Sequence, residues 1–268
     1  MITDMNDFFS PARFWKYFKY DLNNLKNSYG LSLLIIGLAP IIMSIWVHFM
    51  AVFKGLWPMT EYPVSFTVFA FFIMVPVLVL TFPAKTYGKL LDKKDGTVFL
   101  TIPASTFEKF LSMLIISAFV VPVSAVLLFW GSDFLLSVID KAYNPSYSVN
   151  ALNDFFNREI SSYVASINSF GILYLSLSGL MLFFLLCSLL FKKARIGKGI
   201  LILITIMILV GLYFEANSGH WNFLGNNVGE LNAAALETRI NVFLNLFYLL
   251  IFMVLDLCIY FRLKTLKH

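Results

Sequence analysis

Apolar residues along this chain collect in long runs, separated by shorter segments that hold most of the charged residues. Six runs, at 31–53, 63–82, 110–130, 170–191, 199–214 and 240–261, contain no aspartate, glutamate, lysine or arginine except Asp256. A helix needs about 20 apolar residues to cross a hydrocarbon core roughly 30 Å thick. The run 199–214 covers roughly 24 Å at about 1.5 Å per residue, so it needs flanking residues to cross. The pattern predicts six transmembrane helices.

Composition supports the same interpretation. The chain has 268 residues, of which 59% are hydrophobic and 13% charged, whereas a soluble domain is about half apolar and about a quarter charged. We therefore expect the excess apolar surface to face lipid. The first run is longer than the apolar part of a signal peptide and follows a charged stretch, so we expect it to remain as an anchor. The predicted fold class is an all-α integral membrane protein, with 1–268 forming one membrane domain.

The positions of lysine and arginine predict the orientation of the spans. Sixteen of the 20 lie in the N-terminal segment, the 83–109 connection, the 192–198 turn or the C-terminal tail, and four lie on the other side. Basic loops are retained in the cytoplasm, so both chain ends are predicted to be cytoplasmic. The segments 54–62, 131–169 and 215–239 are then external, with 131–169 forming a small cap. The net charge of +5 is explained by topology, without nucleic acid as a partner.

The segment 11–28 has the pattern of an amphipathic helix. Ser10 and Pro11 are typical of a helix start, with serine as the N-cap and proline in the first position. One narrow face is apolar and the opposite face basic. The apolar residues are Phe14, Phe18, Leu22 and Leu25, and the opposite ones are Arg13, Lys16, Lys19, Asn23 and Lys26. Such a helix lies in a membrane interface. It either anchors the first span or transmits movement from a cytoplasmic partner.

The 83–109 connection contains the most informative motif. Its first half is a short charged helix candidate that ends at Gly96. Its second half contains Ser105 and Glu108 at the spacing of a capping box, directly before an apolar run. Pro103 keeps the preceding residues out of that helix. The capping box therefore predicts where the third span begins.

This connection resembles that of the type-2 ATP-binding-cassette (ABC) exporter permeases. The matching positions are Gly96, Thr97, Leu100, Pro103, Ser105, Glu108 and Lys109, together with an N-terminal interfacial helix and six spans with both ends inside. The resemblance implies that a coupling helix in this connection docks into a separate ATPase subunit. The residues it would use are Tyr87, Lys89, Asp92, Lys93 and Lys94.

The resemblance also implies partners and a location. The sequence contains no Gly-x-x-x-x-Gly-Lys-Ser/Thr phosphate loop, so ATP is expected on the partner subunit, and we expect this chain to bind no cofactor or metal and to have no enzyme activity. A permease of this family needs a second copy of itself or a paralogue. The expected location is the bacterial inner membrane, as a multi-pass protein.

Other functions are less well supported by the sequence. An intramembrane enzyme would need a nucleophile with a base or clustered acidic ligands, and an ion-coupled transporter usually has buried acids or broken helices near the midplane. A membrane scaffold without transport activity remains an alternative.

Asp256 is the one residue among the aspartates, glutamates, lysines and arginines that lies within a predicted span. It either forms a local ion pair with Arg262 or Lys264, or an interhelical hydrogen bond, or belongs to a transport path.

Overall fold

The computed structural model describes residues 9–55, 65–139, 170–216 and 233–266. These residues are helical almost throughout and include no strand, which confirms the all-α fold class. The elements in chain order are α1 Pro11–Gly37, α2 Ala39–Phe53, α3 Ser65–Thr86, the 3-10 turn η2 Gly88–Leu91, α4 Lys93–Thr101, α5 Thr106–Ile115, the π-helical turn η3 Ile116–Val120, α6 Val121–Ile139, α8 Phe170–Leu190, α9 Arg195–Ala216 and α10 Ala233–Thr265.

Three described helical segments are long and apolar enough to cross a membrane: Thr106–Ile139, Arg195–Tyr213 and Val242–Thr265. A fourth is possible if the bent pair α1 and α2 counts as one span. The run 199–214 is extended by flanking residues, as expected, because α9 has 22 residues. Residues 131–139 continue α6, and the rest of the predicted external loop lies outside the described residues. Six spans with cytoplasmic ends therefore stay a prediction.

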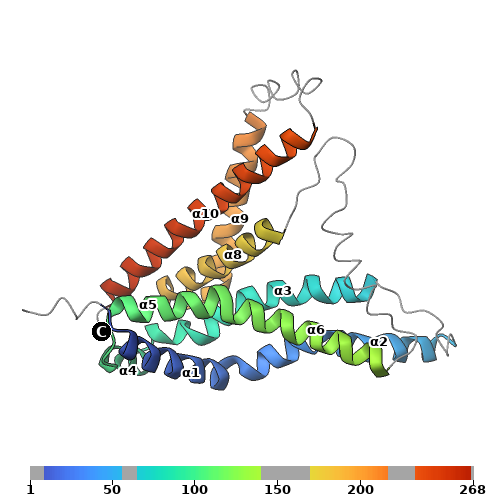
Figure 1. Cartoon of the computed structure of the whole chain (residues 1–268), viewed down its shortest axis with the longest axis horizontal. Helices are drawn as coiled ribbons and strands as arrows, with labels where there is room; N and C mark the ends of the chain where they lie inside the picture. Colours follow the sequence, from blue (N-terminus) through green and yellow to red (C-terminus); the bar gives the residue numbers. More distant parts are fainter. Residues whose placement is uncertain (1–8, 56–64, 140–169, 217–232, 267–268) are drawn as a thin grey trace, which may run out of the picture.

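The helices gather at one end of the molecule (Figure 1). The start of α1, the short helix α4, the start of α5 and the end of α10 lie together at this end. From there α1 and α2 run beside α5 and α6, while α9 and α10 lean away from them. We call the gathered end the basic end, because it holds Arg13, Lys89, Lys109 and Arg262.

The break in the first apolar region lies deeper than predicted. The sequence suggested an interfacial helix that ends near residue 28, but α1 continues to Gly37, and α2 follows with a bend of 44°. Pro40, in the first turn of α2, explains this position. Proline has no N–H to donate to the carbonyl four residues earlier, and its ring clashes with the preceding turn.

Gly37 allows α1 and α6 to approach closely at this bend. A Cβ atom at Gly37 would lie 2.3 Å from the Cβ atom of Leu128, so no larger residue fits there. Ser132 then donates its hydroxyl to the carbonyl of Gly37 at 2.8 Å. That bond satisfies a backbone acceptor near the break. An unsatisfied backbone group in an apolar environment would cost roughly several kcal/mol.

Helix α8 forms the centre of the packed region. Leu182, Leu185 and Leu189 on α8 are fully buried, and α8 lies between α3 and the α9–α10 arm in Figure 1. By contrast, α9 and α10 present most of their large apolar side chains outward, including Met207 and Phe243. Exposed apolar surface of this extent is typical of contact with lipid or with another membrane chain.

Candidate functional site

The candidate site is the junction at the basic end, where α1, the 87–105 connection and α5 meet. The short helix of the connection differs from the prediction, since α4 begins at Lys93 and continues through Gly96 to Thr101. An interior glycine costs a helix about 1 kcal/mol, which packing can offset, and Gly96 is buried whereas Thr97 is exposed. The helix ends before Ile102, whose backbone is extended, because the next residue, Pro103, disfavours a helical conformation at the residue before it.

The predicted capping box is confirmed at the start of α5. The hydroxyl of Ser105 accepts from the backbone N–H of Glu108 at 3.2 Å, and the backbone N–H of Ser105 donates to Glu108 Oε2 at 2.9 Å. Helix α5 therefore begins at Thr106, ahead of the apolar run that starts at residue 110. The local sequence pattern fixed this start correctly because both partners are three residues apart.

Glu108 also holds the start of α1, which the capping motif did not predict. Its carboxylate accepts from the backbone N–H of Ser10 at 2.8 Å, and from Arg13 Nε at 2.8 and 3.0 Å. Ser10 is the N-cap of α1 as predicted, but its side chain makes no capping bond. Glu108 has no solvent exposure. One buried carboxylate thus joins two helix N-termini that are distant in sequence, with the negative charge that such termini favour.

Asp21 is the centre of a second polar contact. It is 3% exposed, and its Oδ2 atom accepts from the hydroxyl of Ser112 at 2.7 Å and from that of Tyr87 at 3.3 Å. Asp21 lies outside the apolar segment that begins at residue 31. Burial raises the pKa of Asp21 to about 6, although the hydrogen bonds from Ser112 and Tyr87 oppose this shift. Burial and the nearby Asp21 raise the pKa of Tyr87 well above its ordinary value, so its hydroxyl stays protonated and donates.

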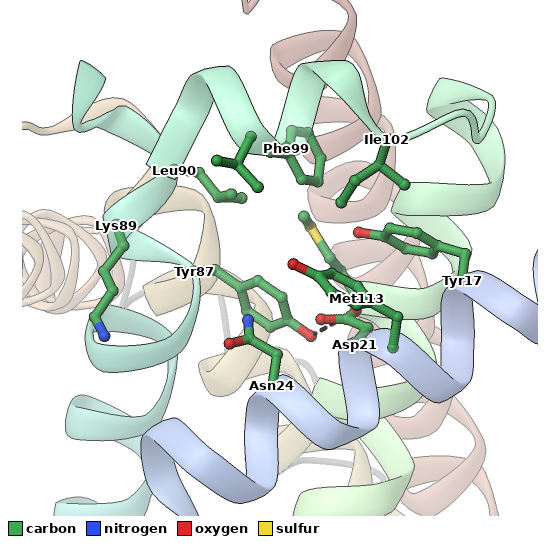
Figure 2. A pocket seen from close by; sticks show the side chains of 11 residues that line it. Tyr17, Asp21, Asn24, Tyr87, Lys89, Leu90, Phe99, Ile102 and Met113 are labelled. Carbon is green, nitrogen blue, oxygen red and sulfur yellow. Dashed lines mark hydrogen bonds between the residues drawn. The ribbon is translucent and has the colours of Figure 1, made fainter. Parts of the chain in front are cut away.

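A cavity of about 230 Å³ adjoins Asp21. Figure 2 shows Tyr17, Asp21 and Asn24 from α1 facing Tyr87, Phe99 and Met113 across it. The cavity lies between the first half of α1 and α4. Because α4 belongs to the 87–105 connection, this connection covers the cavity. Its lining combines aromatic rings with a carboxylate, an arrangement suited to a small polar ligand with an apolar or cationic part.

Lys109 ties α4 to α5. Its ammonium group donates to the backbone carbonyl of Phe99 at 2.6 Å and lies 4.6 Å from the centre of the Phe99 ring. Lys109 is buried, so this contact satisfies a donor that would otherwise be costly to bury. Carbonyls in the last turn of a helix have no partner within the helix, and Lys109 supplies one for α4.

Of the five predicted coupling residues, the structure describes the side chains of Tyr87, Lys89 and Asp92. Tyr87 is 2% exposed and points to Asp21, so its side chain cannot form part of a docking surface in this structure. Lys89 is exposed beside the cavity. Asp92 is largely exposed and accepts from Arg195 Nη2, at the start of α9, at 3.3 Å. The side chains of the other two, Lys93 and Lys94, lie outside the described residues.

Asp256 lies on α10, away from the junction. Its Oδ1 atom is buried and has no hydrogen-bond partner among the described residues. The ion pair with Arg262 or Lys264, one of the alternatives for Asp256, does not form among the described residues. Arg262 Nε donates to the backbone carbonyl of Leu189 at 3.1 Å. That bond joins α10 to the end of α8. Within the described part of the chain, no group of three or more histidine, cysteine, aspartate or glutamate side chains could hold a metal ion.

Sequence reasoning missed the roles of Asp21 and Tyr87. Asp21 lies on the buried face of α1, although the pattern that predicted the amphipathic helix did not include it. That face consists of Tyr17, Asp21, Leu25 and Tyr29. Their spacing of four residues was the available signal, since residues at i and i+4 lie on one helix face.

Comparisons of this chain with protein-family models, with curated proteins and with solved structures found no match.

Proposed function

We propose that this chain is the permease subunit of an ABC exporter, with six spans, both ends in the cytoplasm and a separate ATPase that docks on the 83–109 connection. The apolar helices and the gathering of basic residues at one end support a membrane protein oriented in this way. The motif from Gly96 to Lys109 supports the exporter class by resemblance. The host membrane would be the bacterial inner membrane.

The observation that carries this proposal is the attachment of the connection to two long helices. Tyr87, Phe99 and Ser105, all in the connection, are hydrogen-bonded to side chains of α1 or α5. A partner that moves the connection would therefore move α1 and the start of α5 with it. A ligand shifts an equilibrium only through contacts that differ between states. In the proposed mechanism, ATP changes the state of the ATPase, and the connection passes that change to the two helices.

Affinity purification of the full chain in mild detergent tests the proposal. We expect a soluble subunit that hydrolyses ATP to co-purify, and we expect the double change Lys93→Glu and Lys94→Glu to weaken its recovery at least severalfold. The matched control is Lys192→Glu with Lys193→Glu, which reverses two exposed charges in another basic turn. Recovery of the chain alone from several mild detergents would contradict the proposal and favour a membrane scaffold.

Cysteine labelling tests the topology in a background that lacks Cys187 and Cys258. A cysteine at Ser148 should react with an impermeant reagent from outside the cell. A cysteine at Ala194, exposed in the turn between α8 and α9, should react only after permeabilisation. The reverse pattern would overturn the orientation derived from the lysine and arginine distribution.

A further inference from the structure

The cavity beside Asp21 contains a carboxylate that has no cationic partner in the described part of the chain. Both hydrogen bonds to Asp21 come from neutral hydroxyls, and no lysine or arginine among the described residues forms an ion pair with it. Lys89 lines the same cavity, but Figure 2 shows its ammonium group pointing away from Asp21. A buried carboxylate is usually paired with a cation. The cavity therefore offers a place for a cation that none of the described residues supplies.

Aromatic residues form part of the lining of this cavity. Tyr17, Tyr20 and Tyr87 line the cavity, as does Phe99, whose ring also lies near the ammonium group of Lys109. Aromatic faces attract ammonium groups, and several rings beside a carboxylate form the usual recognition site for a primary or quaternary ammonium. At about 230 Å³ the cavity is smaller than the roughly 300–1,000 Å³ that drug-sized ligands occupy. It fits a group of the size of ethanolamine or choline.

A second, more open cleft of about 620 Å³ adjoins the first, and the charged residues that line it are both basic. Tyr17, Tyr20 and Ile102 line both spaces, so the two lie side by side. Arg13 and Lys16 line the outer cleft. Arg13 is bonded to Glu108, whereas the lysine is exposed. Basic side chains in an open cleft are suited to a phosphate group.

We propose that these two adjoining spaces bind the headgroup of a zwitterionic phospholipid, with its ammonium beside Asp21 and its phosphate beside Lys16 and Arg13. The order of charges along α1 matches the headgroup, since the basic residues precede Asp21 by five to eight residues, about 7.5 to 12 Å along the axis. The long side chains of Lys16 and Arg13 cover the remaining distance to a phosphate. The exposed Trp15 on the same helix suits a membrane interface, where acyl chains would extend into lipid. This inference does not depend on transport activity.

Native mass spectrometry of the detergent-purified full chain tests this site. Dioleoyl-phosphatidylethanolamine and dioleoyl-phosphatidylglycerol share a phosphate and acyl chains, and only the first has an ammonium group. We expect the ethanolamine lipid to be retained preferentially. Asp21→Asn should reduce this preference roughly tenfold, because a hydrogen bond to a charged group is removed. Tyr20→Leu should reduce it about two- to fivefold through the loss of one aromatic face.

The controls separate binding from folding and from general adhesion of lipid. Trp15→Leu removes another exposed aromatic residue of α1 that lines neither space, and it should leave the preference unchanged. Lys16→Ala should weaken both lipids equally. Tyr20 is half exposed, so its replacement tests the site even if Asp21→Asn fails to fold.

Three results would overturn the proposal. The first is equal retention of the two lipids by the unmodified chain, and the second is an unchanged preference in both Asp21→Asn and Tyr20→Leu. The third concerns the source of the headgroup, tested with soluble glycerophosphoethanolamine. Weak displacement of the bound lipid at millimolar concentration supports a lipid ligand. Tighter binding of the soluble compound than of the lipid would assign the site to a free phosphorylated amine.

Discussion

Replacing Glu108 by glutamine should destabilise the protein more than any other single change of charge at the junction. The carboxylate is fully buried and accepts from Ser10, Ser105 and Arg13. Glutamine keeps one oxygen, but its amide group is a donor and would face a donor. The change also removes the negative charge opposite Arg13, whose side chain is 32% exposed.

The structure sets the size of this effect. A buried donor left without an acceptor costs about 1–3 kcal/mol, and breaking a fully buried ion pair costs about 3–5 kcal/mol. Because Arg13 is partly exposed and water can solvate it, we expect a loss of about 2–4 kcal/mol. For a chain of this size that corresponds to a decrease in Tm of roughly 4–16 °C.

Thermal unfolding in detergent, followed by circular dichroism, measures this loss. Asp92→Asn is the matched control, since Asp92 also contacts an arginine, at 3.3 Å, but is 58% exposed, and its pair should contribute less than about 1 kcal/mol. A double-mutant cycle with Arg13→Gln isolates the pair. Equal Tm decreases for Glu108→Gln and Asp92→Asn, or a coupling energy below about 0.5 kcal/mol, would refute the reasoning.

Two further changes test the fold and the buried acid. Gly37→Ala should cost about 1–3 kcal/mol of unfolding free energy, because the new Cβ meets Leu128; Gly131→Ala, where a Cβ meets nothing within 4 Å, should cost nothing, and equal effects would contradict the close approach. Asp21 has a folded pKa of about 6 against an ordinary value of 3.8, so the unfolded chain ionises first as pH rises. Relative to Asp21→Asn, the unfolding free energy of the unmodified chain should therefore fall by about 3 kcal/mol between pH 4 and pH 6 and then stay constant. Denaturation in amine-free buffer across this range measures it. If the difference between the two chains does not change with pH, Asp21 is not buried.

Features with a local physical cause were predicted well. Each long apolar run coincides with a helix or helix pair, because an apolar segment of that length is stable in lipid only with its backbone bonds satisfied within the helix. The start of α5 was located correctly because Ser105 and Glu108 satisfy each other three residues apart. The start of α1 at Pro11 follows from proline's fixed backbone angle.

Features that depend on distant contacts were not predicted. The hydrogen bond between Asp21 and Ser112 joins residues 91 positions apart, and nothing near either residue indicates the other. The burial of Asp21 was not predicted, because it depends on Tyr87 and Ser112, which come from other parts of the chain. The bend at Leu38 had a local signal, since Pro40 stands inside an apolar run, but the charged-to-apolar change near residue 30 suggested an earlier boundary.

The unbroken length of α1 has a mechanical consequence. Its 27 residues extend for about 40 Å, so a tilt of about 5° at the start of the helix displaces the far end by about 3.5 Å. Gentle curvature can absorb part of such a tilt, but no proline interrupts α1 between Ala12 and Gly37, so we expect the helix to transmit much of it. The displacement then reaches the end of α1 at Leu38, where it changes the angle that α2 makes with its neighbours.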